Sequence, residues 1–443
     1  MFRNPARGLP REVVVLSAVA FAVAIGFGIL APAIPVFARE FGVTRTAAAA
    51  VISAFAFMRF VSALGSGQLV DRFGERKVLA TGIWIVAVSS GLAGLAQSYP
   101  QLLLLRGIGG VGSAMFTVAA MSLLLRVVDA DRRGQATAIW QAGFLVGGIV
   151  GPGVGGALAT DSVRAPFFVY AGTLAVAGAI GMLYLRRPSA AELSAAGAGP
   201  GGSSAAPGVG LRAALAQPPY VAALAASLAT GWSLFGVRVS LLPLFVTEPL
   251  GLTPVWTGFG FLVSAAVQVV ALIPAARLTD RVGRRPSLII GTALGALSYL
   301  LIAGSATLAA FLASMALFGV AAAFLGVAPA AIVGDVVMRS AAGSGGGGAA
   351  PVERRIRGGG RGRGRGGGAG GGERRGGKAV AVYQMASDLG VIVGPLITGW
   401  LADRYSFGAA FAATAGLLGI ACAMAIWAPE TRSVRREEDS VSA

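Results

Sequence analysis

Twelve long apolar segments, nearly free of charge, dominate the sequence. An α-helix rises about 1.5 Å per residue, so roughly 20 apolar residues cross the hydrocarbon core of a bilayer. The segments cover residues 13–37, 46–69, 78–97, 101–125, 134–160, 166–185, 220–246, 255–276, 287–306, 308–333, 379–401 and 407–428. The sequence therefore predicts an all-α membrane protein with twelve transmembrane helices.

The composition agrees with this class and excludes others. Of the 443 residues, 55% are hydrophobic and 12% are charged, which is too apolar for a domain with a water-exposed surface. The chain has no histidine and one cysteine, Cys422, so it can form neither an internal disulfide nor a Cys/His metal site. We therefore expect no metal and no cofactor, and the sequence lacks the phosphate-binding loop that would indicate direct ATP coupling.

The basic residues predict the orientation of the chain. If the N-terminus is cytoplasmic, most of the 36 Lys and Arg residues fall in cytoplasmic loops, and the external loops hold Arg39, Arg45, Arg164 and Arg404. This bias follows the positive-inside rule. We expect a plasma (inner) membrane protein with both termini in the cytoplasm, and its net charge of +17 then requires no nucleic acid partner.

Two internal repeats divide the chain into halves. The first pairs Gly42, Asp71, Arg72 and Gly74 with Gly251, Asp280, Arg281 and Gly283; the second pairs Trp140, Gln141, Gly147, Gly151, Pro152 and Gly156 with Tyr383, Gln384, Gly390, Gly394, Pro395 and Gly399. Such repeats are typical of secondary transporters. We predict a six-helix bundle over residues 1–187, a cytoplasmic linker over 188–216, a second six-helix bundle over 217–433 and a cytoplasmic tail over 434–443.

Residues 339–378 form a long Gly/Arg-rich loop that has no counterpart in the first half. Its composition favours disorder, because it offers almost no apolar surface to bury. Three interpretations stay open. The loop is a solvated low-complexity insertion, a reading-frame artefact of a G/C-rich gene, or a segment that binds RNA or anionic lipid headgroups.

A charged motif follows both the second and the eighth predicted span. The copies are Gly67-Gln-Leu-Val-Asp71-Arg72-Phe-Gly74-Glu75-Arg76-Lys77 and Ala276-Arg-Leu-Thr-Asp280-Arg281-Val-Gly283-Arg284-Arg285. The two motif copies, the twelve spans and the linker together cover nearly the whole chain, and in these features the chain resembles the major facilitator superfamily. Two residues depart from the signature of that family, Glu75 in the first copy and Ala276 in the second.

The resemblance implies the major facilitator fold, with twelve transmembrane helices in two pseudo-symmetric bundles. It also implies a conformational switch made by Gly67, Asp71, Arg72, Gly74 and Arg76 in the first copy and by Asp280, Arg281, Gly283, Arg284 and Arg285 in the second. We expect Gly67 to permit close helix packing and Asp71 to meet the N-terminal dipole of a neighbouring helix. The alternative is a solvated loop whose charges only set topology.

A glycine-rich element in the fifth span resembles the antiporter motif of the same superfamily. Gly147, Gly151, Pro152, Gly155 and Gly156 fit this motif, while Ala138 replaces its first glycine. The resemblance implies proton-coupled export, although glycines that only pack helices together would give the same pattern.

Four charged residues lie inside the predicted spans. Arg106 resembles the buried arginine that the family links to proton transfer, although a structural arginine that reaches the bilayer surface is the alternative. Asp388 is a carboxylate near the middle of a span, and we predict that it binds and releases the proton or pairs with an arginine on a facing helix. Arg59 and Arg238 are candidates for contact with substrate.

Together these features predict a secondary active transporter, not an enzyme, that exports small amphipathic or drug-like molecules in exchange for protons by alternating access. Its partners would be the substrate, protons and the lipid bilayer, and we expect a monomer. One alternative is a proton-coupled importer of a metabolite such as an organic anion, with Arg59 and Arg238 as counter-charges. A third is a transporter-like membrane sensor or tether that acts through the Gly/Arg-rich loop.

Overall fold

The structure is a computed structural model, which describes residues 10–129, 132–184, 211–345 and 375–431. Every regular element in these ranges is a helix. Twelve helical stretches are long and apolar enough to cross a membrane, so the prediction of an all-α protein with twelve transmembrane helices is confirmed. The predicted tail, most of the predicted linker and residues 346–374 of the predicted loop lie outside the described residues.

The first six spans form the N half. Its helices are α1 (Arg11–Leu30), α2 (Ile34–Arg39), α3 (Arg45–Phe73), α4 (Glu75–Gly94), α5 (Tyr99–Val127), α6 (Arg133–Asp161) and α7 (Ala165–Tyr184). A turn at residues 31–33 separates α1 from α2. Buried apolar residues of the N half belong to a core cluster that continues into the C half, and in it the rings of Phe37 and Phe167 lie 5.2 Å apart.

The last six spans form the C half. Its elements are α9 (Leu211–Leu215), α10 (Pro218–Thr230), the π-helical turn η2 (Gly231–Val237), α11 (Arg238–Ser240), α12 (Leu242–Thr247), α13 (Pro254–Arg281), α14 (Arg284–Ala303), α15 (Leu308–Gly345), α16 (Arg375–Arg404) and α17 (Phe407–Trp427). α10 to α12 make one span, Pro218–Thr247. α15 and α16 extend into the stretch predicted as a disordered loop, and α9 lies in the predicted linker.

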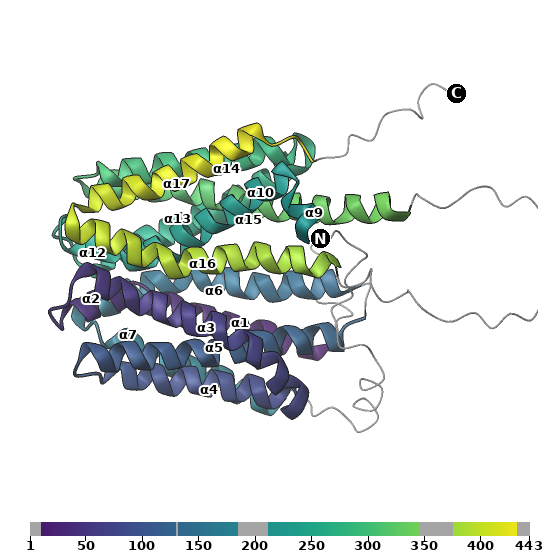
Figure 1. Cartoon of the computed structure of the whole chain (residues 1–443). Coiled ribbons are helices and arrows are strands. Elements are labelled where there is room, and N and C mark those ends of the chain that lie inside the picture. Colours follow the sequence, from purple (N-terminus) through teal and green to yellow (C-terminus); the bar gives the residue numbers. More distant parts are fainter. Residues whose placement is uncertain (1–9, 130–131, 185–210, 346–374, 432–443) are drawn as a thin grey trace, which may run out of the picture.

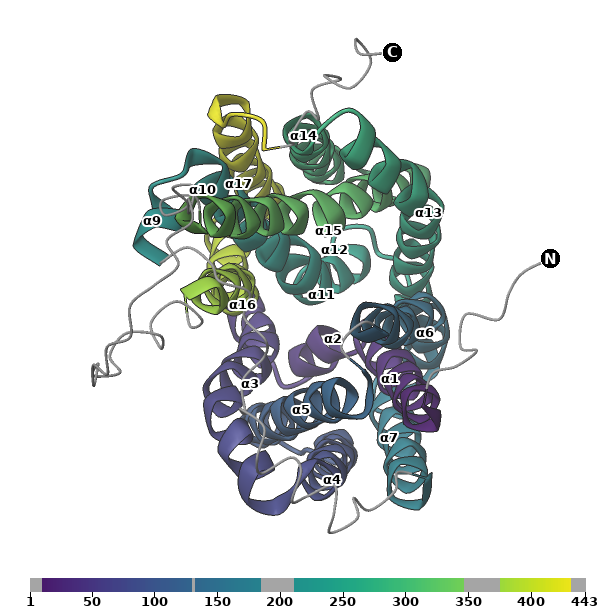
Figure 2. The same ribbon diagram turned by 90° about the vertical axis from the view of Figure 1, so that its right-hand side faces the viewer.

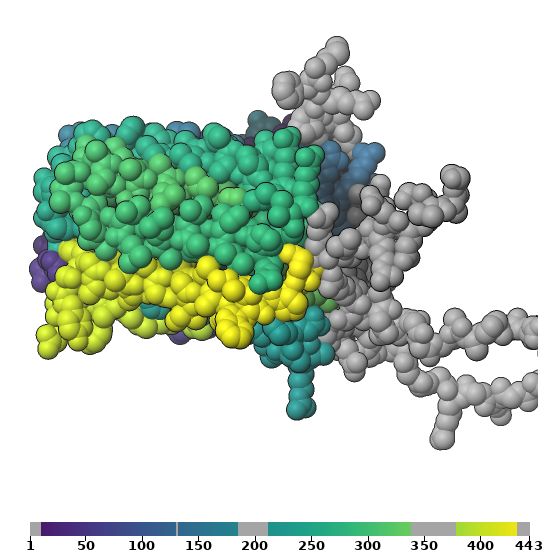
Figure 3. Space-filling view, turned by 90° about the horizontal axis from the view of Figure 1, so that it is seen from above, coloured from purple at the N-terminus to yellow at the C-terminus, as the bar shows by residue number. Residues whose placement is uncertain are grey.

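The two halves lie side by side with their helices roughly parallel (Figure 1). A view along the helices shows the two groups, which touch where α3 meets α16 and, on the opposite side of the molecule, where α6 meets α13 (Figure 2). α17 runs along the outer face of the C half (Figure 3). We call the end at which the described chain starts and finishes the near end, and the opposite end the far end.

Among the residues that the structure describes, four glycines have positive φ angles, and they are two pairs of the first sequence repeat. Gly42 (φ 72°) and Gly251 (φ 61°) lie before α3 and α13, and Gly74 (φ 81°) and Gly283 (φ 140°) follow the same helices. Residues with a side chain rarely adopt this backbone conformation. The repeat is therefore explained locally, because each glycine lets the chain reverse direction between consecutive spans.

Candidate functional site

The far end holds the polar links between the two halves. Glu248, after α12, accepts hydrogen bonds from the Nε atoms of Arg39 (2.9 Å) and Arg45 (2.8 Å) of the N half. The three side chains are 25 to 35% exposed, so each ion pair is partly screened by solvent. One carboxylate of the C half thus bridges two arginines of the N half.

A second carboxylate of the C half caps a helix of the N half. Asp403, near the end of α16, accepts from the backbone N–H groups of Arg45 (2.9 Å) and Thr46 (2.8 Å), and from the Thr46 hydroxyl (2.6 Å). These N–H groups open α3 and lack partners within that helix, and the helix dipole there favours a negative charge. We call Arg39, Arg45, Thr46, Glu248 and Asp403 the far-end latch.

The glycines of the second repeat pack the halves against each other at two related places. A Cβ atom built on Gly156 of α6 would lie 2.9 Å from the Cα atom of Gly258 in α13, and one built on Gly399 of α16 would lie 2.8 Å from the Cα atom of Thr46 in α3. Both distances are shorter than real contacts allow. A side chain at Gly156 or Gly399 would therefore clash with the helix of the other half.

The other antiporter-motif residues of α6 pack inside the N half. Gly147, Gly151 and Gly155 lie against the backbone of α1, and Pro152 contacts Gly28 of that helix. The motif therefore has two packing roles here: its first members hold α6 on α1, and its last glycine lies at the boundary between the halves.

At the near end, the first copy of the charged motif is not packed against the other half. No heavy atom lies within 4 Å of a Cβ atom built on Gly67 or Gly74, and Asp71 and Arg72 are exposed. The expected close packing at Gly67 and the expected helix-dipole contact of Asp71 are therefore not seen in this conformation. The reason is that α3 and α16 diverge towards the near end (Figures 1 and 2).

Ion pairs and hydrogen bonds of charged residues hold the second copy of the charged motif in place. Arg284, at the start of α14, pairs with Asp280 at 3.0 Å and with Asp335 of α15 at 3.2 Å. The carboxylate of Glu430 accepts from the backbone N–H groups of Arg284 (2.9 Å) and Arg285 (3.0 Å) and so caps α14. The motif thus ties α13, α14, α15 and the end of the chain that the structure describes.

The N half has a matching ion pair with the charges exchanged. Glu75, at the start of α4, pairs with Arg126 of α5 at 3.1 Å. Glu75 corresponds to Arg284 in the repeat, and Arg126 corresponds to Asp335. Each precedes its counterpart by the number of residues that separates Gly74 from Gly283. The departure of Glu75 from the family signature is therefore compensated by its partner.

Two arginines inside the spans, the buried Arg106 and the half-buried Arg238, have no carboxylate partner among the described residues. Arg106 of α5 is 1% exposed, its Nε and Nη1 atoms have no hydrogen-bond partner, and its guanidinium lies 4.5 Å over the ring of Phe55. Arg238 of α11 lies 4.6 Å over the ring of Phe261, and its Nη2 atom donates to the Phe261 carbonyl (3.1 Å). Cation–π contact offsets part of the cost of burying each charge.

Asp388 and Arg59 lie on the two helices that meet at one side of the boundary between the halves, α16 and α3. Asp388 is half-buried, Arg59 is exposed, and the two side chains do not reach ion-pair distance, 4.0 Å. The neighbouring Ser387 packs against Gly231 of the π-helical turn η2. Arg106 and Arg238 do not join this pair.

Sequence reasoning missed the far-end latch. Arg39 and Arg45 are two of the few basic residues in the predicted external loops, but they served only to set topology. Glu248 and Asp403 fall in the same loops, so a search for opposite charges at that end would have found the four residues without showing which pairs form.

Comparisons with known proteins agree with this geometry. The sequence model of the Major Facilitator Superfamily matches residues 16–350 and 372–442. The chain is 29% identical over 164 residues to multidrug resistance protein 1 of Bacillus subtilis and 28% identical over 170 residues to the quinolone resistance protein NorA of Staphylococcus aureus. These alignments cover 37% and 38% of this chain and 42% of each relative, so they span less than half of those proteins.

A solved structure shares the fold along nearly the whole chain. It is a bacterial homologue of the human lysosomal transporter Spinster in an inward-facing and unoccupied conformation, with a TM-score of 0.71 and 16% sequence identity. The superposition covers 94% of this chain and 96% of the other.

Proposed function

Because the chain belongs to the major facilitator superfamily, we propose that it exports small amphipathic or drug-like molecules in exchange for protons. Its twelve spans make it a multi-pass membrane protein. In the orientation that the positive-inside rule favours, the near end and both termini face the cytoplasm, and the membrane is the inner (plasma) membrane.

The observation that carries this proposal is the uneven closure of the two halves. The far-end latch and the Gly156 and Gly399 crossings join the halves at the far end, while α3 and α16 diverge at the near end. Two rigid bundles that close at one end and open at the other are the two-state element that alternating access requires. This conformation corresponds to the state that accepts substrate from the cytoplasm.

Proton coupling would act through the Asp388 and Arg59 pair. A negative Asp388 attracts Arg59 across the boundary and favours the approach of α16 to α3. A proton on Asp388 removes this attraction, so protonation changes the relative free energy of the two conformations. The positive charge of Arg106, which is buried in the N half, would raise the local electrostatic potential and so repel an incoming proton.

One observation favours export: the relatives are named for resistance to several drugs and to quinolones. The packing of the antiporter-motif glycines fits export and simple helix packing equally. The alternative, import of an organic anion, has one observation in its favour, namely the buried Nε atom of Arg238 without a hydrogen-bond partner.

Everted membrane vesicles test the proposal. With an imposed proton gradient that is acidic inside, an exporter accumulates a fluorescent quinolone in the vesicle lumen, and lumenal protons leave. We expect Asp388→Asn to abolish the dependence on the gradient, whereas Asp161→Asn, a carboxylate at the end of a span, leaves it intact. Proton-driven movement of substrate out of the vesicles would contradict export.

A further inference from the structure

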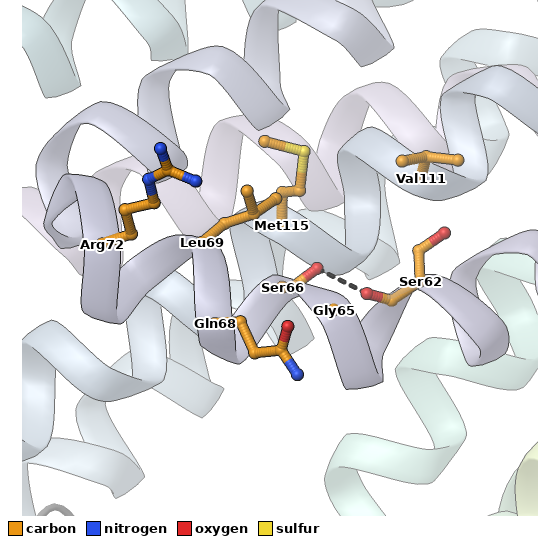
Figure 4. Close-up of a pocket in the computed structure, with 8 residues that line it drawn as sticks. All are labelled: Ser62, Gly65, Ser66, Gln68, Leu69, Arg72, Val111 and Met115. Carbon is orange, nitrogen blue, oxygen red and sulfur yellow. Dashed lines mark hydrogen bonds between the residues drawn. The ribbon is translucent and has the colours of Figure 1, made fainter.

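The near-end part of the N half contains a hollow of about 440 Å³ between α3 and α5. This volume lies within the range of small-molecule binding sites in proteins. Figure 4 shows its lining, which consists of Ser62, Gly65, Ser66, Gln68, Leu69 and Arg72 of α3 with Val111 and Met115 of α5. None of these residues carries a negative charge.

The lining separates a charged head region from an apolar region. Arg72 is its only charged residue, and in the part of the chain that the structure describes this guanidinium forms no hydrogen bond or ion pair; its nearest aromatic ring, that of Phe73, is 5.3 Å away. Leu69 and Met115 lie beside Arg72, and Val111 lies one helical turn further along α5 (Figure 4). An anion at Arg72 would therefore have apolar surface next to it.

The other polar groups of the lining are neutral. The Ser66 hydroxyl donates to the Ser62 carbonyl (2.8 Å), and the amide of Gln68 lies on the other side of α3 from the Arg72 guanidinium (Figure 4). A cationic ligand would meet the positive charge of Arg72 with no carboxylate in the lining to offset it.

The charges inside the spans independently favour the same class of ligand. Arg59, Arg106 and Arg238 lie away from the ends of their spans, and among the described residues Asp388 is the carboxylate that lies as deep. The membrane-embedded part of the protein is thus net positive. A buried positive environment raises the free energy of a cation and lowers that of an anion.

We propose that the hollow between α3 and α5 binds an amphiphile with an acidic head, which is held by Arg72 while its apolar part lies on Leu69, Met115 and Val111. The inference rests on the proposed export function, because it names the class of molecule that is exported. The ligand is a single-chain solute that reaches the near end from the cytoplasm.

A binding experiment tests the site without relying on transport. The purified full-length protein, in nanodiscs of zwitterionic phosphatidylcholine, is labelled with a photoreactive analogue of laurate, and the labelled peptides are mapped by mass spectrometry. Unlabelled laurate, dodecylamine and dodecanol, which share one chain and differ in the head, then compete. We expect labelling within residues 62–72 and 111–115, with laurate competing at least about tenfold better than dodecylamine, or about 1.4 kcal/mol.

Substitutions separate the charge from the apolar surface. Arg72→Gln should weaken laurate binding about tenfold and leave dodecanol binding unchanged, while Arg72→Lys keeps most of the affinity, since a point charge remains. Arg281→Gln is the matched control, because Arg281 holds the same position in the second motif copy but does not line the hollow. Equal competition by laurate and dodecylamine, or an unchanged Arg72→Gln variant, would overturn the proposal.

Two further arms separate the solute site from a lipid site and from the export function. If phosphatidylglycerol in the nanodisc displaced laurate as well as free laurate does, the hollow would be a site for bilayer lipid, and the assignment to a solute would be overturned. If everted vesicles moved a quinolone but the protein bound no laurate, the inference would fail while export stood. If the laurate analogue labelled the hollow but no compound moved with the proton gradient, the proposed binding site would stand and the proposed export function would be contradicted.

Discussion

The exchanged ion pair of Glu75 and Arg126 gives the sharpest test of the physical argument. The Glu75 Oε2 atom lies 3.1 Å from the Arg126 Nη1 atom, and the Ser122 hydroxyl is 3.4 Å from Oε1. The Glu75 side chain is 10% exposed and that of Arg126 is 30% exposed. Glu75→Arg would place two guanidinium groups where the C half places Arg284 beside Asp335.

The magnitude follows from burial and distance. Two unit charges about 4 Å apart interact by about 4 kcal/mol at an effective dielectric constant of about 20. Breaking a fully buried pair costs about 3 to 5 kcal/mol, and the access of Arg126 to water reduces this value. We therefore expect Glu75→Arg to lower the free energy of unfolding by about 2 to 3 kcal/mol, and Arg126→Asp to do nearly the same.

The double variant should recover most of this loss, because it copies the charge order of Arg284 and Asp335. Unfolding in mixed detergent micelles, followed by tryptophan fluorescence, would close a double-mutant cycle. We expect a coupling energy of at least about 2 kcal/mol that persists in high salt, since the pair is mostly buried. Lys77→Glu, an exposed neighbour, is the control and should change stability little. A coupling energy near zero would refute the view that the exchange compensates Glu75.

Three further predictions concern the latch and the glycines. Asp403→Ala removes the carboxylate that accepts from the first two N–H groups of α3, a contact worth about 1 kcal/mol, while Thr44 still caps the helix through Ala47. Spin labels on the far-end loops should then show a larger separated population; an unchanged distance distribution would contradict the latch. Gly156→Val should abolish transport of the quinolone in everted vesicles, whereas Gly148→Val, where no atom lies within 4 Å, should retain it. Gly74→Ala should lower the free energy of unfolding by about 1 kcal/mol because of its positive φ alone, and the helical Gly416→Ala, which also has open space, should not lower it.

The sequence predicts those features that depend on neighbouring residues. Span positions follow from local hydropathy, and the first repeat follows from backbone conformation, because Gly42, Gly74, Gly251 and Gly283 are needed wherever φ is positive. Helix ends are harder to predict from the sequence. α15 continues to Gly345 although the Gly/Arg composition after residue 339 favours disorder, because the preceding helix propagates into residues of poor helix propensity.

Contacts between residues distant in the chain could not be predicted in the same way. Asp403 caps α3 through Arg45 and Thr46, more than 350 residues earlier, and no local pattern encodes such a partner. The close packing predicted for Gly67 is not seen in this conformation for a related reason. A residue at a moving boundary has different neighbours in each state, and sequence alone does not say which state is populated.

The two helix crossings between the halves are related by the repeat, and this constrains how the halves can move. A Cβ atom on Gly156 would meet Pro254 and Gly258 of α13, and one on Gly399 would meet Thr46 and Ala49 of α3. Ala49 precedes Gly258 by the spacing that separates Gly42 from Gly251, so the same contact is built twice. Two tight crossings on opposite sides of the molecule define a line (Figure 2). Rotation about that line separates α3 from α16 and α6 from α13 at one end while pressing them together at the other, and any motion that pulled the halves straight apart would break both crossings at once.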